Sequence, residues 1–168
     1  MSSRLKNYIL ILVIIAVSVG CDQGTKILAR QHLKSQGTIR VVGNFFILTY
    51  VENDGAFLSM GSNLPQPFKT ILLTFFPVVV VLAGLGYLFL AKHHSLAEMI
   101  CIAFIIGGGI SNLYDRIMYH GLVTDFINFG VGPWLRTGVL NVADMYITFG
   151  GIGLIVIQLM NRPKNVSE

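Results

Sequence analysis

Four long apolar segments constrain this chain more than any other feature of its sequence. They span roughly residues 8–29, 68–91, 96–118 and 139–160. Each segment holds the roughly 20 residues that a helix needs to cross a hydrocarbon core of about 30 Å. Charged residues make up only 12% of the chain, about half their usual share in a soluble domain. We therefore predict an all-α membrane protein with four transmembrane helices in one polytopic domain, residues 1–168.

Basic residues predict which ends of these helices face the cytoplasm. Arg4 and Lys6 precede the first segment, Lys92, His93 and His94 fill the turn between the second and third, and Arg162 and Lys164 follow the fourth. By the positive-inside rule these places, and hence both termini, are cytoplasmic. Because the basic residues occur in ones and twos, we attribute the net charge of +4 to topology and expect no nucleic-acid binding. The residues before Cys21 fit a cleavable signal sequence poorly, so we expect no cleavage there.

Two connections, about residues 30–67 and 119–138, are then extracytoplasmic. The first contains the stretch from Thr38 to Val51, which is rich in β-branched and aromatic residues and is followed by Asn53-Asp54-Gly55. This composition between turn-forming residues is typical of strands. We expect a small extracytoplasmic β-element between helices 1 and 2.

Most acidic residues map to the extracytoplasmic half of the chain. They are Asp22, Glu52, Asp54, Asp115, Asp125 and Asp144. Asp144 is expected about five residues into the fourth helix, about 8 Å below its outer end. Placing an unpaired carboxylate at membrane depth costs roughly a few kcal/mol of free energy or more. One explanation is structural, because Arg116 and Arg136 are available for buried ion pairs. The other is chemical, because adjacent antiparallel helices would bring Asp125 and Asp144 together.

A pair of carboxylates in one site shares a single proton near neutral pH. Such a pair can hydrolyse an amide, because the ionised member takes a proton from the attacking water while the protonated member polarises the carbonyl oxygen. This chemistry needs no metal and no cofactor. The sequence has dispersed histidines and none of the zinc-peptidase, serine-hydrolase or P-loop motifs. Intramembrane carboxylates also relay protons, so a small proton-coupled membrane transporter is the alternative.

Five polar motifs occur in order along almost the whole chain. They are Asp22-Gln23-Gly24-Thr25-Lys26, Asn53-Asp54-Gly55-Ala56-Phe57, Gly108-Gly109-Ile110-Ser111-Asn112-Leu113-Tyr114-Asp115-Arg116, Val123-Thr124-Asp125-Phe126 and Asn141-Val142-Ala143-Asp144. This pattern resembles the lipoprotein signal peptidase (signal peptidase II) family of membrane aspartic peptidases. The resemblance implies that Asp125 and Asp144 are the catalytic pair. It implies that substrate binding or site architecture depends on Asp22, Lys26, Asn53, Gly55, Asn112, Asp115, Arg116 and Asn141.

The resemblance also implies a substrate and a location. The substrate is a prolipoprotein whose cysteine carries diacylglycerol, and the cut falls on the N-terminal side of that cysteine. The location is the bacterial cytoplasmic membrane, with the active site near its extracytoplasmic face and with membrane lipids as neighbours. We expect a monomer. Leu140 and Met145 depart from the residues usual in the family, which leaves an inactive lipopeptide-binding homologue as a further alternative.

Overall fold

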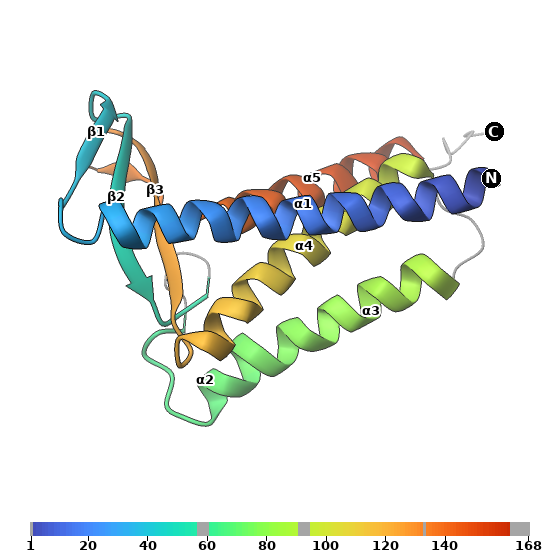
Figure 1. Cartoon of the computed structure of the whole chain (residues 1–168), viewed down its shortest axis with the longest axis horizontal. Helices are drawn as coiled ribbons and strands as arrows, with labels where there is room; N and C mark the ends of the chain where they lie inside the picture. Colours follow the sequence, from blue (N-terminus) through green and yellow to red (C-terminus); the bar gives the residue numbers. More distant parts are fainter. Residues whose placement is uncertain (1, 57–60, 91–94, 133, 162–168) are drawn as a thin grey trace, which may run out of the picture.

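The computed structural model describes residues 2–56, 61–90, 95–132 and 134–161 (Figure 1). Its helical elements are α1 (Ser3–His32), α2 (Phe68–Thr70), the π-helical η2 (Ile71–Phe75), α3 (Phe76–Leu90), α4 (Leu96–Met118) and α5 (Val142–Met160). Its strands are β1 (Ile39–Val42), β2 (Phe46–Asn53), β3 (Val123–Val131) and β4 (Leu135–Arg136). The motif residue Phe57 lies outside the described residues.

Among the described residues, four helical segments are long and apolar enough to cross a membrane, which confirms the predicted number. They are Arg4–His32, Phe68–Leu90, Leu96–Met118 and Val142–Met160. Figure 1 shows that α1 begins and α5 ends at the same end of the bundle, while the sheet lies at the other end. The predicted turn at Lys92, His93 and His94 lies outside the described residues, as do Arg162 and Lys164.

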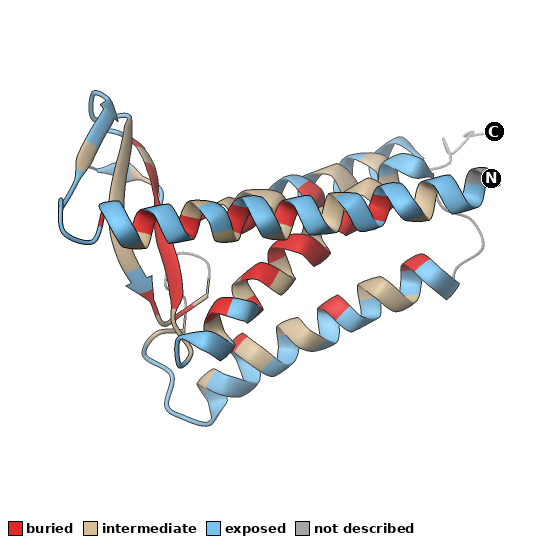
Figure 2. Ribbon diagram, viewed as in Figure 1, coloured by how far each residue is buried: buried red, intermediate tan, exposed pale blue. Residues whose placement is uncertain are grey.

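The sheet has the order β1-β2-β3-β4 and is antiparallel throughout. The predicted β-element between the first two membrane helices is present, but it forms only part of this sheet, because β3 and β4 come from the connection between α4 and α5. We predicted no strand there. The reason is that β3 is buried along most of its length (Figure 2), so Thr124 and Asp125 do not alternate with apolar residues as in a half-buried strand.

Small residues let α4 approach both α1 and α5 closely. A β-carbon added at Gly108 would lie 2.5 Å from the carbonyl oxygen of Ala143 in α5, and one added at Gly107 would lie 2.7 Å from Cβ of Ser18 in α1. Without a hydrophobic driving force between helices in lipid, such close packing is a main source of association. The middle of α4 is thereby held against the middle of α1 and against the first turn of α5.

We expect Gly108→Ala to lower the thermal unfolding temperature, because the added methyl group collides with the backbone of α5. Gly151→Ala is the matched control, since a β-carbon at Gly151 has no neighbouring atom within 4 Å. The measurement is the unfolding midpoint of both variants in the same detergent. Equal midpoints for Gly108→Ala and the wild type would contradict the close α4–α5 contact.

Candidate active site

Asp125 and Asp144 are brought together by a strand and the start of a helix. Asp125 lies in β3, opposite Val51 of β2, and is only 2% exposed. Beyond β4 the chain returns to β3, where Leu140 pairs with Ile127 through backbone hydrogen bonds immediately before α5 begins. Asp144 therefore approaches from the first turn of α5. The predicted route, through two adjacent antiparallel helices, is wrong for Asp125, because that residue belongs to the sheet.

The start of α5 is fixed by a capping box. The Asn141 side chain accepts a hydrogen bond from the backbone N–H of Asp144 (2.9 Å), and Oδ2 of Asp144 accepts one from the backbone N–H of Asn141 (3.1 Å). Because Asn141 caps the helix, α5 begins at Val142 and not near residue 139. Asp144 therefore lies in the first helical turn, closer to the helix end than the predicted depth of about 8 Å.

Two asparagines hold the carboxylate of Asp125. Nδ2 of Asn53 donates to Oδ2 of Asp125 (2.8 Å), and Nδ2 of Asn141 donates to Oδ1 (2.6 Å). Oδ1 of Asn53 is occupied, because it accepts the backbone N–H of Gly55 (2.8 Å). The oxygen of Asn141 is likewise occupied by the helix cap. Each amide is therefore fixed with its NH₂ group toward Asp125.

A third asparagine, Asn112 of α4, holds Asp144. Nδ2 of Asn112 donates to Oδ1 of Asp144 (3.0 Å). Its own oxygen accepts from Nζ of Lys26 (2.7 Å) and from Nδ2 of Asn141 (3.1 Å). Since a lysine ammonium can only donate, Lys26 fixes the orientation of the Asn112 amide. Through Asn112, Lys26 thus ensures that Asp144 faces an NH₂ group that donates a hydrogen bond to it.

Lys26 itself lies in a fully buried ion cluster. Its Nζ is 2.7 Å from Oδ2 of Asp22 and 3.1 Å from Oδ2 of Asp115, and all three side chains are 0% exposed. Oδ1 of Asp22 accepts the backbone N–H of Ala143 in α5 (2.7 Å). The cluster therefore ties α1 to α4 and to the residue next to Asp144.

The arginines that we proposed as ion-pair partners have other roles. Nη2 of Arg116 donates to the carbonyl oxygen of Gly55 (2.6 Å), and its Nε is buried without a partner among the described residues. Arg136 donates to Oδ1 of Asn128 and to a backbone carbonyl in the turn between β1 and β2. Within the described part of the chain, the ion pairs of buried Asp22 and Asp115 are made instead with Lys26 and Arg30.

Burial raises the pKa of Asp125 to about 7, and repulsion by the carboxylate of Asp144 adds to this effect. The hydrogen bonds from Asn53 and Asn141 act in the opposite direction, because they stabilise the ionised form. A carboxyl group with this pKa exchanges its proton near neutral pH. General acid–base catalysis is most efficient with a group whose pKa lies near the working pH.

A cavity of about 420 Å³ opens beside Asp144. Its polar lining is Asn112, Arg116 and Asp144, and its apolar lining includes Leu72, Leu73, Phe76, Leu113 and Ile147. Leu140 and Met145, the two departures from the family pattern, are not part of this lining. They pack instead in a core cluster with Phe126 and Ile127.

Four further polar residues belong to this network and were not predicted. They are Gln23, Arg30, Ser111 and Thr124. Helical spacing was an available signal for Arg30, because it follows Lys26 by four residues as Lys26 follows Asp22, and residues at this spacing share a helix face. Gln23, Ser111 and Thr124 lie within the five motifs, so their place in a motif was the signal available for them, although none of the three was named as a site residue. Among the described residues, no group of three or more His, Cys, Asp or Glu side chains is arranged to hold a metal ion.

Comparisons with known proteins identify the family and the fold of this chain. A family model described as "Signal peptidase (SPase) II" matches residues 14–160. A relative from Treponema denticola, named "Lipoprotein signal peptidase", is 35% identical over 165 residues, which cover 95% of each chain. A relative of the same name from Caldanaerobacter subterraneus subsp. tengcongensis is 41% identical over 143 residues, 84% of this chain and 90% of the relative. A solved structure described as "Bacterial membrane enzyme structure by the in meso method at 2.3 A resolution" has the same fold, with a TM-score of 0.79 at 22% identity over 95% of this chain and 94% of that one.

We expect Lys26→Met to destabilise the fold by about 3–5 kcal/mol, because it leaves Asp22 and Asp115 buried without their shared cation. The measurement is the free energy of unfolding in detergent. Lys34→Met is the matched control: it removes a lysine charge just beyond the end of the same helix, but its partner Glu52 is solvent-exposed, so little change is expected. If both variants unfolded alike, the buried cluster would not support the fold.

The stability of the protein should depend on pH through Asp125. Its folded pKa of about 7 lies above the value of about 3.9 expected for the unfolded chain, so the native state binds an extra proton between these values. This contribution is complete below about pH 4 and is lost as the pH rises through about 7. We therefore expect the unfolding midpoint of the wild type to fall, relative to that of Asp125→Asn, as the pH rises across this window. Parallel curves for the two proteins would disprove the raised pKa.

Proposed function

The chain belongs to the signal peptidase II family of membrane aspartic peptidases, and from this premise we propose that Asp125 and Asp144 are its catalytic pair. The observation that carries the proposal is the shared set of asparagine donors. Asn141 donates to Asp125 and caps the helix turn that holds Asp144, so one residue fixes both carboxyl groups. The proposed activity is removal of the signal peptide from a diacylglyceryl-modified prolipoprotein, with cleavage N-terminal to the lipidated cysteine.

The proposed mechanism uses one proton shared between the two carboxyl groups. The ionised member accepts a proton from water as the water oxygen attacks the scissile carbonyl carbon, while the protonated member donates to the carbonyl oxygen. The group that took the water proton then donates it to the amide nitrogen. The C–N bond breaks and the amine leaves, while the other carboxylate takes a proton back from a hydroxyl of the intermediate, so that the pair again holds one proton. The pKa of about 7 at Asp125 supports this exchange near neutral pH. Because both aspartates receive fixed donors, their orientation does not change between steps.

The cavity beside Asp144 supports a lipidated substrate. Its apolar side chains come from η2, α3, α4 and α5, all of which face hydrocarbon in the four-helix arrangement. Acyl chains of a diacylglyceryl group fit such a lining, and burial of each CH₂ contributes about 0.8 kcal/mol. Asn112 and Arg116, at the polar end of the cavity, are proposed to contact the substrate near the bond to be cut. Asn53 and Gly55 adjoin these residues, because Gly55 binds both Asn53 and Arg116 through its backbone. We propose that they make further contacts with the substrate backbone.

We propose that the sheet end of the bundle is extracytoplasmic in the bacterial cytoplasmic membrane. Arg4 and Lys6 lie at the start of α1, at the opposite end of the bundle, and the positive-inside rule assigns that end to the cytoplasm. The aspartate pair is then reached by water from outside and by lipidated substrate from the membrane. Because one chain supplies both aspartates and the whole cavity lining, we propose that the protein acts as a monomer in contact with membrane lipids.

The proton-coupled transporter is not favoured. A proton relay requires ionisable groups along the whole path across the bilayer. Glu98 lies in the first turn of α4, at the end of the bundle away from the sheet, so it does not continue a path from Asp144. The inactive homologue is also less well supported, because Leu140 and Met145 pack outside the cavity lining and leave the aspartate contacts intact.

We expect Asp125→Asn and Asp144→Asn each to lower the cleavage rate of a diacylglyceryl prolipoprotein by at least about 10²-fold, because each removes a proton-transfer group. The measurement is cleavage by purified protein in lipid bicelles. Glu98→Gln is the control, since it removes an acid at the far end of the bundle and should cleave at the wild-type rate.

Three results would contradict the proposal. Cleavage by both aspartate variants at the wild-type rate would show that the pair is not catalytic. Proton flux in liposomes that depends on Asp144, without cleavage by the wild type, would favour the transporter. Binding of the lipidated peptide without cleavage by the wild type would favour the inactive homologue.

A further inference from the structure

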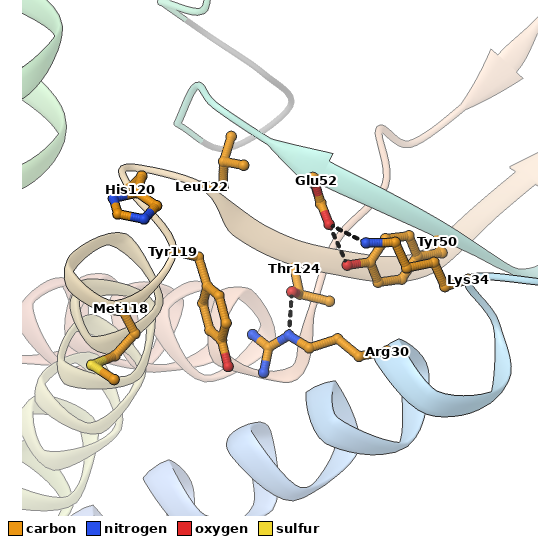
Figure 3. Close-up of a pocket in the computed structure, with 9 residues that line it drawn as sticks. All are labelled: Arg30, Lys34, Tyr50, Glu52, Met118, Tyr119, His120, Leu122 and Thr124. Carbon is orange, nitrogen blue, oxygen red and sulfur yellow. Dashed lines mark hydrogen bonds and ion pairs between the residues drawn. The ribbon is translucent and has the colours of Figure 1, made fainter.

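A second cavity, of about 380 Å³, lies against the β2–β3 pair (Figure 3). It is lined by Arg30, Lys34, Tyr50, Glu52, Met118, Tyr119, His120, Leu122 and Thr124. Successive side chains of a strand point to opposite faces, so Thr124 faces this cavity while its neighbour Asp125 faces the aspartate site. The cavity therefore adjoins the active site through a single strand.

Arg30 joins three elements in this cavity. Its Nε donates to Oγ1 of Thr124 in β3 (2.9 Å), and its Nη2 donates to Oδ1 of Asp115 in α4 (3.0 Å). The guanidinium carbon lies 4.1 Å from the ring centroid of Tyr119, which is a cation–π contact. Figure 3 shows the guanidinium group between the Tyr119 ring and Thr124. The side chain of Arg30 is 17% exposed, so it is packed but reachable from the cavity.

The partners of Arg30 lead to both members of the proposed pair. Oδ2 of Asp115 accepts the backbone N–H of Thr124 (3.1 Å), so Arg30 and Asp115 together hold this residue by its side chain and its backbone. Thr124 directly precedes Asp125 in the chain. Toward Asp144, Asp115 shares Lys26 with the amide of Asn112. Arg30 therefore acts on each aspartate through an intermediate and touches neither.

Arg30 also balances the buried charge. Lys26 and Arg30 carry two positive charges, and Asp22 and Asp115 carry two negative ones, so the four groups are neutral together. Loss of the arginine charge leaves one excess negative charge beside the aspartate pair.

The other charged groups around Arg30 do not supply the positive charge that would be lost with Arg30. Glu52 of β2 is the remaining acid on the cavity side, and it is paired with exposed Lys34 of the same cavity. His120 lines the cavity beyond Tyr119, and Arg116 of α4 faces the other cavity, beside Asp144.

We propose that Arg30 is a positioning residue for the aspartate pair: it fixes Thr124 and Asp115 so that β3 presents Asp125 toward Asp144, and it neutralises the buried acids behind them. The inference rests on the proposed function, because its effect is measured on the cleavage reaction. Its two components, geometry and charge, are separable by substitution.

The first experiment compares Arg30→Gln, Arg30→Lys and the control Lys34→Gln on the lipidated substrate. Arg30→Gln should lower kcat by about 10–100-fold with little change in KM, as for other residues that orient reacting groups. Both limbs of its pH–rate profile should move to higher pH, because the excess negative charge makes the aspartate pair hold its protons more tightly. Arg30→Lys keeps the charge but not the two-pronged donor geometry, so its pH limbs should stay in place while kcat falls.

Lys34→Gln should match the wild type in both respects, because Lys34 lines the same cavity but makes no contact with Asp115 or Thr124. Unfolding midpoints of all variants show whether a loss of activity merely follows a loss of stability. A purely structural role would lower the midpoint without moving the pH limbs.

The second experiment is chemical rescue of Arg30→Ala. The cavity of about 380 Å³ gives a small cation access to the vacated position. Methylguanidine, which restores the planar donor group, should increase kcat of this variant in a saturable way and leave Lys34→Gln unaffected. Methylammonium, which restores only charge, should shift the pH limbs back and restore kcat less.

The outcomes separate this inference from the function on which it rests. Wild-type kcat and an unshifted pH profile in Arg30→Gln would overturn the positioning role while cleavage by the wild type still stood. A rescue by methylammonium equal to that by methylguanidine would overturn the geometric component. Absence of cleavage by the wild type would instead reject the proposed function.

Discussion

The buried ammonium group of Lys26 is the interaction on which the rest of the site depends. A charge at this depth is tolerated only if paired, and Asp22 and Asp115 pair it completely. Because these partners also bind the backbone of Ala143 and Thr124, the first helix is connected to the residues that precede both Asp144 and Asp125. Because the charge of Lys26 must be paired, its two aspartates bring β3 and the start of α5 together beside it.

The donors around the aspartates follow from the same requirement. An asparagine amide can present either its oxygen or its NH₂ group to a carboxylate, and only the second stabilises the pair. In Asn112, Asn141 and Asn53 the oxygen is already occupied, by Lys26, by a helix N-terminus and by a backbone N–H respectively. Rigid donors of this kind need no reorganisation during a reaction. In the proposed mechanism, the helix cap and the turn after β2 therefore serve the aspartate pair as well as the fold.

Sequence patterns predicted the helices well and the sheet poorly. Length and hydropathy determine whether a segment spans a membrane, so the four spanning segments were correct. Strand β3 was missed because its burial depends on two partners that a local pattern does not reveal. One is β2, which is distant in the sequence, and the other is Leu140, which pairs with β3 through an isolated bridge outside any strand. The motifs identified both members of the proposed pair. They did not identify all the ion pairs that support it, because we expected Arg116 and Arg136 as the cations, whereas Lys26 and Arg30 form the pairs. Partner choice depends on side-chain direction, which spacing alone does not determine.

The alternation of Thr124 and Asp125 along β3 has a consequence for how the protein avoids misassembly. A one-residue slip of β3 would turn Thr124 toward the active site and Asp125 toward the cavity behind it. The slipped strand would leave the inner carboxylate of Asp115 without its backbone donor and Arg30 without Thr124. Unsatisfied buried groups of this kind each cost about 1–3 kcal/mol. The slipped register is therefore disfavoured energetically by the same contacts that hold Asp125 in its place in β3.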